Sequence, residues 1–334
     1  MTGRPTIYDV ARAAGLAPST VSRALTRPGR VSAHTAERVR RIAAELGYTR
    51  APAPGPVAPG QVVALMTCDI TNPHVAEIVR GAEQEAARRG YTVLLCDTRE
   101  SPAREADVLR RVLPVVDGVV LASSRLSDAE VGEAARTRPT VVINRSLEGV
   151  PTIVLDHAQG AHLAIDHLHG LGHRSVGYVP GPATSPVEDE RSRGLERAAR
   201  ERDVGLVRLR PASPTLEGGA GAGAELVRTG VGAVIGYNDL IAIGLLQGLA
   251  RRGVRVPDDV SVVGFDNIDL GRVVRPRLTS VGAPLRTLGE SSMRNLLQRL
   301  TTPGRGTVRT ARLPVGLVVR GSTGPPAQAG PRSR

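Results

Sequence analysis

Short apolar runs that alternate with helical patterns constrain the fold of residues 61–324 more than any other feature. Runs rich in Val, Leu and Ile are typical of buried strands, and they fall at 62–66, 92–96, 118–121, 140–143, 175–179, 233–235 and 261–265. Helical patterns such as 75–89 and 240–252 lie between them. This alternation predicts an α/β body of doubly wound parallel sheets covered by helices.

Polar side chains follow several of these runs, where parallel sheets bind ligands at the carboxyl ends of their strands. The pairs are Asp69 and Asn72, Asn144 and Arg145, Asn238 and Asp239, and Asp266 and Asn267. An Asp can accept hydrogen bonds from hydroxyl groups, an Asn can accept and donate, and Arg191 can donate a fork of N–H groups. Each Asp or Asn could instead cap the helix that follows its strand.

The first 50 residues show a different pattern, that of a small all-α head. Thr6 is a good helix N-cap with Asp9 at the capping-box position, and Gly15 ends this helix. Pro18 suits the start of a second helix. Ser32 caps a third helix that Gly47 ends. The expected inward residues are Ile7, Val10, Ala11, Ala14, Val21, Leu25, Val39, Ile42, Ala43 and Leu46.

Two short helices joined by a tight turn make a helix-turn-helix, whose second helix enters the major groove of DNA. Its outward residues would be Pro18, Ser19, Ser22 and Arg23. Arg23 can pair with guanine through two hydrogen bonds, and Ser19 is a weaker reader. We expect contacts with DNA phosphates from Thr20, Ser22, Arg30, Ser32 and Thr35. Thr6 is also predicted to bind DNA. A three-helix bundle with a solvated basic face is the alternative.

The charge distribution favours nucleic-acid binding by this head. The chain has a formal net charge of +12 and contains no Lys, so this positive charge comes from Arg. Nine Arg against three acidic residues give residues 1–50 a charge of +6, half of the total. A basic head on a nearly balanced body is the electrostatic footprint of a DNA-binding protein.

Several classes of protein are disfavoured by the sequence. No apolar run approaches the roughly 18 residues that a membrane span needs, and the start of the chain has no apolar segment of a secretory signal. Cys68 and Cys96 cannot form a disulfide framework, so we expect two buried, reduced thiols in a cytoplasmic protein. The segment 219–224 fits a dinucleotide-binding pattern but follows a Pro-rich breaker, so we interpret it as the start of a Gly-rich helix.

The head resembles that of lactose-repressor (LacI/GalR) family regulators. The resemblance rests on Thr6-Ile-Tyr-Asp-Val-Ala11, Ala14-Gly15, Thr20-Val-Ser-Arg23, Val31-Ser32, Thr35 and Glu45-Leu-Gly-Tyr48. The body is similar to the effector domain of that family at Asp69-Ile-Thr-Asn-Pro73, Val116-Asp-Gly118, Asn238-Asp239 and Val263-Gly-Phe-Asp266, among others. The resemblance implies two lobes, with crossovers near residues 156, 284 and 309, and a ligand cleft between them. It assigns effector contacts to Asn144, Arg191, Asn238 and Asp266, and Asp69 and Asn72 fit the first loop of the cleft.

Three departures from the family pattern stand out. Ala17 replaces the usual Ser N-cap of the second helix. Four prolines in residues 51–60 are incompatible with the short hinge helix that family members form on DNA. His74 and Val75 stand where members commonly carry aromatic residues, so ring stacking on a sugar is not expected from this loop.

The predicted organisation is a DNA-binding head at 1–50, a Pro/Gly-rich linker at 51–60, an effector-binding and dimerisation domain at 61–324, and a disordered tail at 325–334. Lobe 1 would comprise about 61–156 and 285–308, and lobe 2 about 157–284 and 309–324. The predicted function is a homodimeric regulator, a repressor of a palindromic operator, gated by a small polar ligand such as a sugar or a nucleoside. We expect no catalysis, cofactor, metal or membrane partner; a solute-binding protein of a transporter and a sugar-converting α/β enzyme are the alternatives.

Overall fold

The computed structural model describes residues 5–26, 31–46, 48, 61–302 and 310–327. The chain divides into two compact units, Met1–Ala58 and Pro59–Arg334, and each is described here by itself. The predicted linker at 51–60 lies outside the described residues. Of the predicted disordered tail, residues 325–327 are described. Pro326 lies beside Gly172, so the chain stays on the body up to this point.

The head consists of three helices, α1 (Ile7–Ala14), α2 (Pro18–Thr26) and α3 (Ala33–Glu45). Asp9 accepts hydrogen bonds from the backbone N–H and the hydroxyl of Thr6, at 2.9 and 2.6 Å. Gly15 ends α1 in the left-handed conformation, as expected. The core of the head contains Val10, Ala11, Ala14, Val21, Ala24, Val39 and Ala43.

The prediction that Leu46 faces the core of the head is wrong. Leu46 is 39% exposed, because α3 ends at Glu45 and Leu46 is its C-cap, outside the apolar stripe. Ser32 caps α3 as predicted, since its Oγ accepts a hydrogen bond from Thr35 N at 3.2 Å. Ala17 precedes α2 and offers only its carbonyl, which accepts a hydrogen bond from Val21 N at 3.1 Å.

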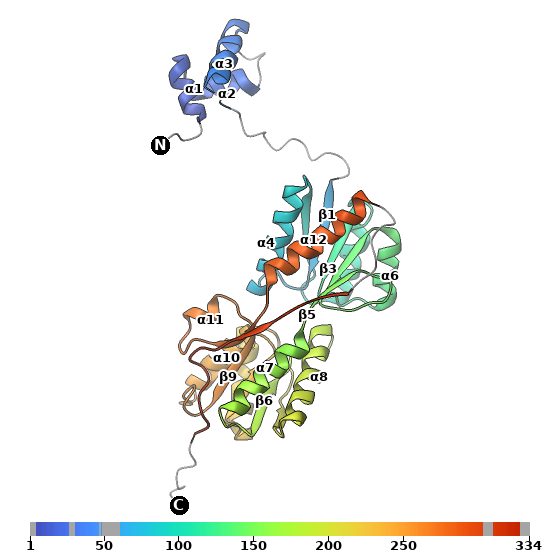
Figure 1. Ribbon diagram of the computed structural model, residues 1–334, viewed down its shortest axis with the longest axis vertical. Helices are drawn as coiled ribbons and strands as arrows, with labels where there is room; N and C mark the ends of the chain where they lie inside the picture. Colours follow the sequence, from blue (N-terminus) through green and yellow to red (C-terminus); the bar gives the residue numbers. More distant parts are fainter. Residues whose placement is uncertain (1–4, 27–30, 47, 49–60, 303–309, 328–334) are drawn as a thin grey trace, which may run out of the picture. The chain divides into compact units, whose positions relative to one another are not determined.

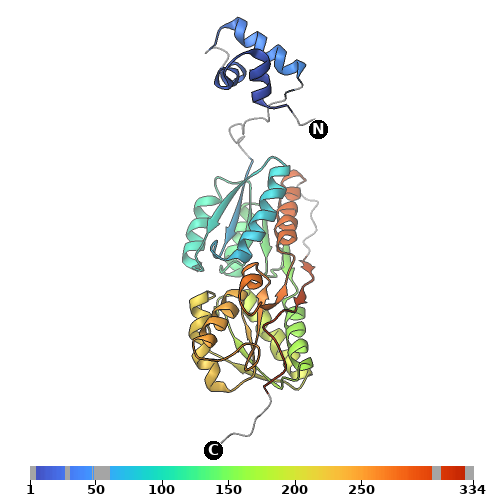
Figure 2. The same ribbon diagram turned by 90° about the vertical axis from the view of Figure 1, so that its left-hand side faces the viewer.

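The first lobe is built on a parallel sheet which, among the described residues, has six strands in the order β11-β5-β4-β3-β1-β2. The strands are β1 (Val62–Thr67), β2 (Thr92–Asp97), β3 (Gly118–Ala122), β4 (Thr140–Ile143), β5 (Thr152–Leu155) and β11 (Thr310–Leu313). The helices are α4 (Pro73–Arg88), α5 (Pro102–Val112), α6 (Asp128–Thr137) and α12 (Leu285–Thr301). Helices α4 and α12 pack side by side against the sheet (Figures 1 and 2).

The second lobe has a sheet of six described strands in the order β12-β10-β9-β8-β6-β7. The strands are β6 (Ser175–Val179), β7 (Gly205–Arg208), β8 (Ala233–Gly236), β9 (Ser261–Asp266), β10 (Thr279–Gly282) and β12 (Gly316–Val318). Only β12 is antiparallel to its described neighbour. The helices are α7 (His157–Gly170), α8 (Pro186–Glu201), α9 (Leu216–Thr229), α10 (Asp239–Ala250) and α11 (Leu270–Val273).

The described chain passes between the two sheets at three places. The first is Asp156, between β5 and α7, and the second is Pro284, between β10 and α12. The third lies between Leu313 and Gly316, not near residue 309. This boundary was predicted too early because β11 pairs in parallel with β5 and therefore remains in the first lobe. Its exposed residues gave no strand pattern.

The Gly-rich segment 219–224, predicted as a helix start, lies within α9, which begins three residues earlier at Leu216, and it packs tightly on α10. A Cβ on Gly219 would lie 2.1 Å from the carbonyl oxygen of Ile241. On α10, a Cβ on Gly244 would lie 2.1 Å from the carbonyl oxygen of Leu216. The backbones of α9 and α10 can therefore approach this closely because glycines without side chains, Gly219 and Gly244, lie at the contact.

This contact predicts opposite effects for two alanine substitutions in α9. Gly219→Ala should destabilise the protein by about 1–3 kcal/mol, because its methyl group overlaps the backbone of α10. Gly221→Ala should stabilise it by about 0.5–1 kcal/mol, because a Cβ there meets nothing within 4 Å and alanine favours a helix. Urea denaturation measures both changes. Equal effects of the two substitutions would contradict the proposed packing constraint.

Candidate functional site

A small cavity of about 50 Å³ lies between the lobes, at the carboxyl ends of both sheets. The first lobe contributes polar groups from Cys68, Asn72, His74, Glu100, Ser123, Arg125 and Asn144, and the second from Arg191, Tyr237, Asn238 and Asp266. The structure therefore brings together five of the six predicted effector residues. Asp69 is not among the described residues that line the cavity. Its carboxylate instead accepts hydrogen bonds from the N–H and hydroxyl of Thr71, at 2.9 and 2.6 Å.

Arg191 is the most heavily contacted of these side chains. It lies on α8, is 4% exposed, and has its guanidinium carbon 5.0 Å from the ring centroid of Tyr237 and 4.5 Å from that of Phe265. Two aromatic faces stabilise a buried cation through their quadrupoles. The same group donates hydrogen bonds to the Tyr237 carbonyl and, at 3.3 Å, to Asp266 Oδ1. Arg191 is therefore held in one position.

His157 completes the surroundings of Arg191. The Arg191 Nε donates to His157 Nδ1 at 3.4 Å, which requires an unprotonated acceptor nitrogen. Burial, reinforced by the charge of Arg191, lowers the pKa of His157 well below its ordinary value. The imidazole is therefore neutral at physiological pH and serves as the acceptor.

Asp266 stands at the end of β9 and faces both lobes. Burial disfavours its charged form, but the nearby His74 and Arg191 outweigh burial and lower the pKa of the carboxyl. His74 Nδ1 lies 3.1 Å from Asp266 Oδ1. Asp266 is therefore ionised at neutral pH and accepts hydrogen bonds only.

The loop after β9 is held by a second buried carboxyl, Asp239. It accepts hydrogen bonds from the N–H of Ile268 at 2.8 Å and the hydroxyl of Ser280 at 2.5 Å. Burial and the neighbouring Asp266 raise the pKa of Asp239 well above its ordinary value. Asp239 thus positions the segment that carries Asp266. From the sequence, Asp239 could have been either a helix-capping residue or a ligand contact.

The three asparagines each use a side-chain oxygen within the protein. Asn72 Oδ1 accepts from His74 N at 3.0 Å and caps α4, and Asn238 Oδ1 accepts from Ile241 N at 2.9 Å and caps α10. Asn144 Oδ1 accepts from Leu155 N at 3.3 Å. The capping interpretation therefore holds for Asn72 and Asn238, while their positions on the cavity wall leave the amide groups at the site.

An ion pair on the first-lobe side was missed by the sequence analysis. Arg125, whose side chain is 2% exposed, donates from Nε and Nη2 to Glu100 Oε2 at 3.0 and 2.6 Å. Each residue lies three positions after a strand, β2 or β3, so the rule that identified Asn144 could have found them. Beside them, Cys68 is half-buried rather than buried as expected, and burial and Glu100 raise its pKa to about 12.

Backbone strain is concentrated around this cavity. Glu100, Ser123, Asn144 and Asp266 have φ values of 56°, 54°, 59° and 118°, in the region that favours glycine. All four line the cavity. Residues held in such conformations cluster at ligand-binding sites, where the surrounding structure stabilises them.

The buried side chain of Glu188 fixes the loop between β6 and α8 in the second lobe. It accepts hydrogen bonds from the Tyr178 hydroxyl at 2.7 Å and the Gly181 N–H at 2.9 Å. Arg208 Nη2 donates to its other oxygen at 3.0 Å. At the end of the same loop, the Ser185 and Tyr237 hydroxyls lie 2.9 Å apart. Through this loop, Glu188 supports Tyr237, one of the two aromatic rings on which Arg191 packs.

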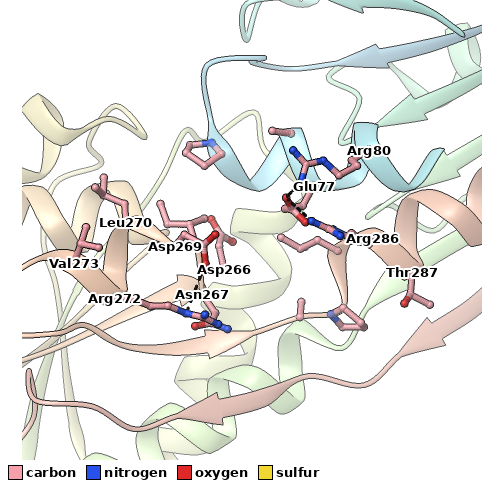
Figure 3. A pocket seen from close by; sticks show the side chains of 16 residues that line it. Glu77, Arg80, Asp266, Asn267, Asp269, Leu270, Arg272, Val273, Arg286 and Thr287 are labelled. Atoms are coloured by element: carbon pink, nitrogen blue, oxygen red, sulfur yellow. Dashed lines mark hydrogen bonds and ion pairs between the residues drawn. The ribbon is translucent and has the colours of Figure 1, made fainter. Parts of the chain in front are cut away.

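A wider groove of about 740 Å³ adjoins the cavity and shares Asp266 with it. Figure 3 shows Glu77, Arg80 and Arg286 on one side and Asp269, Leu270, Arg272 and Val273 on the other. Its arginines already have acidic partners: Arg80 and Arg286 both pair with Glu77, and Arg272 pairs with Asp269. The cavity is the better candidate because buried polar groups from both lobes converge on it, whereas the charged side chains on the two sides of the groove are exposed and already paired.

In the head, the predicted DNA-reading residues lie on one short helix. Pro18, Ser19 and Arg23 of α2 are exposed, whereas Thr20 and Ser22 are half-buried. Thr6 is exposed and engaged with Asp9. Ser32 and Thr35 have hydroxyl oxygens 2.7 Å apart. Arg30 lies outside the described residues.

Three histidines of the segment 157–173 have partners within the second lobe. His162 contacts Glu201 at 3.0 Å, His167 contacts Thr323 at 2.9 Å, and His173 Nε2 lies 3.0 Å from the Gly324 carbonyl. No group of three or more His, Cys, Asp or Glu side chains suited to a metal ion occurs within the described part of the chain. Within those same residues, no helix has the length and apolarity to cross a membrane.

Comparison with known proteins agrees with this arrangement. The model of the lacI family of bacterial regulatory proteins matches residues 6–51, and that of a periplasmic binding protein-like domain matches residues 165–323. The chain is 32% identical to the HTH-type transcriptional regulator DegA of Bacillus subtilis, over 96% of this chain and 99% of that one.

Two solved structures share the fold. A LacI family regulator of Enterococcus faecalis with bound ribose is 32% identical, with a TM-score of 0.72, over 79% of this chain and 99% of that chain. The lac repressor dimer bound to operator and the anti-inducer ONPF is 26% identical, with a TM-score of 0.73, over 96% and 100%.

A helix-turn-helix head and a two-lobed, periplasmic-binding-protein-like body define a DNA-binding transcriptional regulator. The chain belongs to the LacI family. The predicted fold class and family are confirmed, and the solute-binding and enzymatic alternatives are not supported.

The Glu188 network predicts a large effect of a conservative substitution. Glu188→Gln should destabilise the protein by about 2–4 kcal/mol, because an amide NH₂ would face donors from Tyr178 and Gly181 or from Arg208. Glu196→Gln, at an exposed position of the same helix, is the control and should change stability by less than about 0.5 kcal/mol. Urea denaturation provides the comparison, and a Glu188→Gln variant as stable as the control would rule out the supporting role.

Proposed function

We propose that this protein is a repressor that binds a palindromic operator as a homodimer and is controlled by a small, sugar-like effector bound between its lobes. The observation that carries this proposal is the convergence of Asn144, Arg191, Asn238 and Asp266 on one cavity between the lobes. An ionised acceptor beside a guanidinium suits the adjacent hydroxyl groups of a sugar. The related Enterococcus faecalis structure contains ribose.

The proposed control depends on the three connections between the lobes. A ligand that contacts groups on both lobes stabilises the arrangement in which those groups are close together. In a dimer, a change in the angle between lobes alters the distance between the two points from which the heads emerge. The affinity for a two-part operator would then change without any contact between effector and DNA.

The proposed role is binding without chemistry at the cavity. Its one described thiol, Cys68, has a pKa of about 12 and is therefore protonated at physiological pH, which makes it a poor nucleophile. The rest of the wall carries amides, ion pairs, apolar side chains, the hydroxyls of Ser123 and Tyr237 and the imidazole of His74, and we assign all of these a binding role. Because its target is DNA, we place the protein in the cytoplasm.

DNA selection tests the proposal as a whole. Purified full-length protein would select binding sites from random duplex DNA, with and without a panel of pentoses, hexoses and nucleosides. We expect a palindromic consensus and a change of at least about tenfold in operator affinity with one of these compounds. A consensus without two-fold symmetry, or an affinity that no compound alters, would refute the corresponding part of the proposal.

Arg23 should read a base rather than a phosphate. Arg23→Ala should reduce specific operator affinity by about 1–3 kcal/mol, the value of a two-hydrogen-bond contact with guanine, and should affect nonspecific DNA far less. Arg41→Ala, at an exposed position of α3, is the matched control for lost positive charge. Fluorescence anisotropy on both DNAs gives the values. Equal losses on operator and nonspecific DNA would assign Arg23 to the phosphate backbone.

Arg191 and Asp266 should be required for the effector response. Arg191→Ala and Asp266→Ala should each abolish the change in operator affinity that the effector causes in the wild-type protein. Asp269→Ala is the control, since this nearby carboxylate is 94% exposed and lies outside the cavity wall. Circular dichroism confirms folding. A folded Asp266→Ala variant that responds at wild-type effector concentrations would exclude this site.

A further inference from the structure

His74 reaches from the first lobe to a charged group of the second. It is the second residue of α4, and its backbone N–H is fixed by Asn72. Its ring nitrogen Nδ1 lies 3.1 Å from Oδ1 of Asp266, with side-chain exposures of 12% and 5%. A phenylalanine at this position would have no ring nitrogen with which to make this contact. His74 therefore bridges the two lobes inside the cavity.

The geometry of this bridge is imperfect. Asp266 Oδ1 is also the acceptor for Arg191 Nη2 at 3.3 Å, so Arg191 and His74 share one oxygen. Within the described chain, His74 Nδ1 is a buried polar atom without a well-aligned hydrogen bond, so it is close to Asp266 but not in good hydrogen-bonding geometry. Buried polar groups left in this condition are energetically costly and gain from a better partner.

A second bridge between the lobes lies outside the cavity and differs in character. Arg312 of β11 pairs with Glu190 of α8 at 3.0 Å and with Asp156 at the first crossover at 3.5 Å. The Arg312 side chain is 49% exposed, so solvent screens these pairs. It also lies next to the crossovers, where the lobes are connected covalently. Of these two bridges, the buried pair of His74 and Asp266 is the one that lies at the cavity, where it opposes separation of the lobes.

We infer that His74 holds the two lobes together through Asp266 and that the effector must displace it from this carboxylate. This inference rests on the proposed function for the existence of an effector, but the bridge itself requires none. The charged and titratable groups around the bridge are Asp266 of β9, Arg191 of α8 and His157 of α7.

Displacement makes His74 a specificity-determining residue. Only a ligand that offers Asp266 a better-aligned donor than the imidazole gains from entering the cavity. Adjacent hydroxyl groups can donate to both oxygens of one carboxylate, whereas His74 reaches one. The bridge therefore favours polyols with neighbouring hydroxyls over ligands of similar size that present a single donor.

A native thiol provides the measurement. Cys68 lines the same cavity and is half-buried, whereas Cys96 lies in the core of the first lobe. Opening of the lobes should expose Cys68 to a small uncharged reagent such as N-ethylmaleimide and leave Cys96 protected. The groups that shift the pKa of Cys68 are burial, Glu100, Arg125 and Asp69. A substitution of His74 therefore removes none of the charged groups that act on this thiol, and it changes labelling through burial, which limits access to the thiol and raises its pKa.

Two substitutions of His74 distinguish the role of its aromatic ring from the role of its N–H donor. Both are measured in the full-length protein without DNA or ligand. His74→Phe retains an aromatic ring but cannot contact Asp266 as a donor, and it should accelerate labelling of Cys68 by about tenfold. His74→Gln retains an N–H donor and should remain within about twofold of wild type. His162→Gln is the control, because His162 contacts Glu201 and Ala158 within the second lobe. Peptide mass spectrometry assigns the labelled cysteine.

Three results would overturn the inference: wild-type labelling in His74→Phe, equal acceleration by His74→Phe and His74→Gln, or acceleration in the His162→Gln control. Because the rates are measured on the free protein, they decide whether the bridge exists even if no compound in the effector panel alters operator binding. Accelerated labelling without any effector response would retain the bridge and reject the proposed effector control.

Discussion

The buried guanidinium of Arg191 is the interaction on which the cavity depends. A cation that is 4% exposed has lost its hydration and must recover it from fixed neighbours. It does so with the carbonyl of Tyr237, the carboxylate of Asp266 and the ring nitrogen of His157. These partners come from three separate segments of the second lobe. One charge therefore sets the relative positions of the ends of β8 and β9 and the start of α7.

The surrounding residues serve this arrangement in turn. Gly181 has no side chain because a Cβ there would lie 2.6 Å from the ring of Tyr237, the ring that covers Arg191. Asp239 holds the loop after β9, and a Cβ on Gly264 would lie 2.2 Å from its Oδ1. Tight packing near these polar groups excludes water and strengthens the interactions among charges. The site is therefore built before any ligand contact is made.

The two lobes contribute different chemistry to the cavity. The second lobe supplies a rigid charged cluster centred on Arg191, whereas the first supplies the Arg125–Glu100 pair, three side chains on strained backbone and His74. In the proposed control, a binding site divided between two lobes that share three connections in the described chain would convert ligand contacts into a change of lobe angle. This conversion is what a regulator requires, and it depends on the weak contacts between lobes as much as on the strong ones within them.

Periodicity and local chemistry determined much of this protein directly. The helices of the head follow from caps and apolar spacing at Thr6, Gly15 and Ser32, and the buried central strands follow from their apolar runs, because these signals act within a few residues. Tertiary structure decided the rest. Strand β11 is exposed and polar, and only its pairing with β5 shows to which lobe it belongs. The pairing of Arg125 with Glu100, and of His74 with Asp266, joins residues 25 and 192 positions apart, and no local pattern specifies which charges meet when sheets are brought together in space.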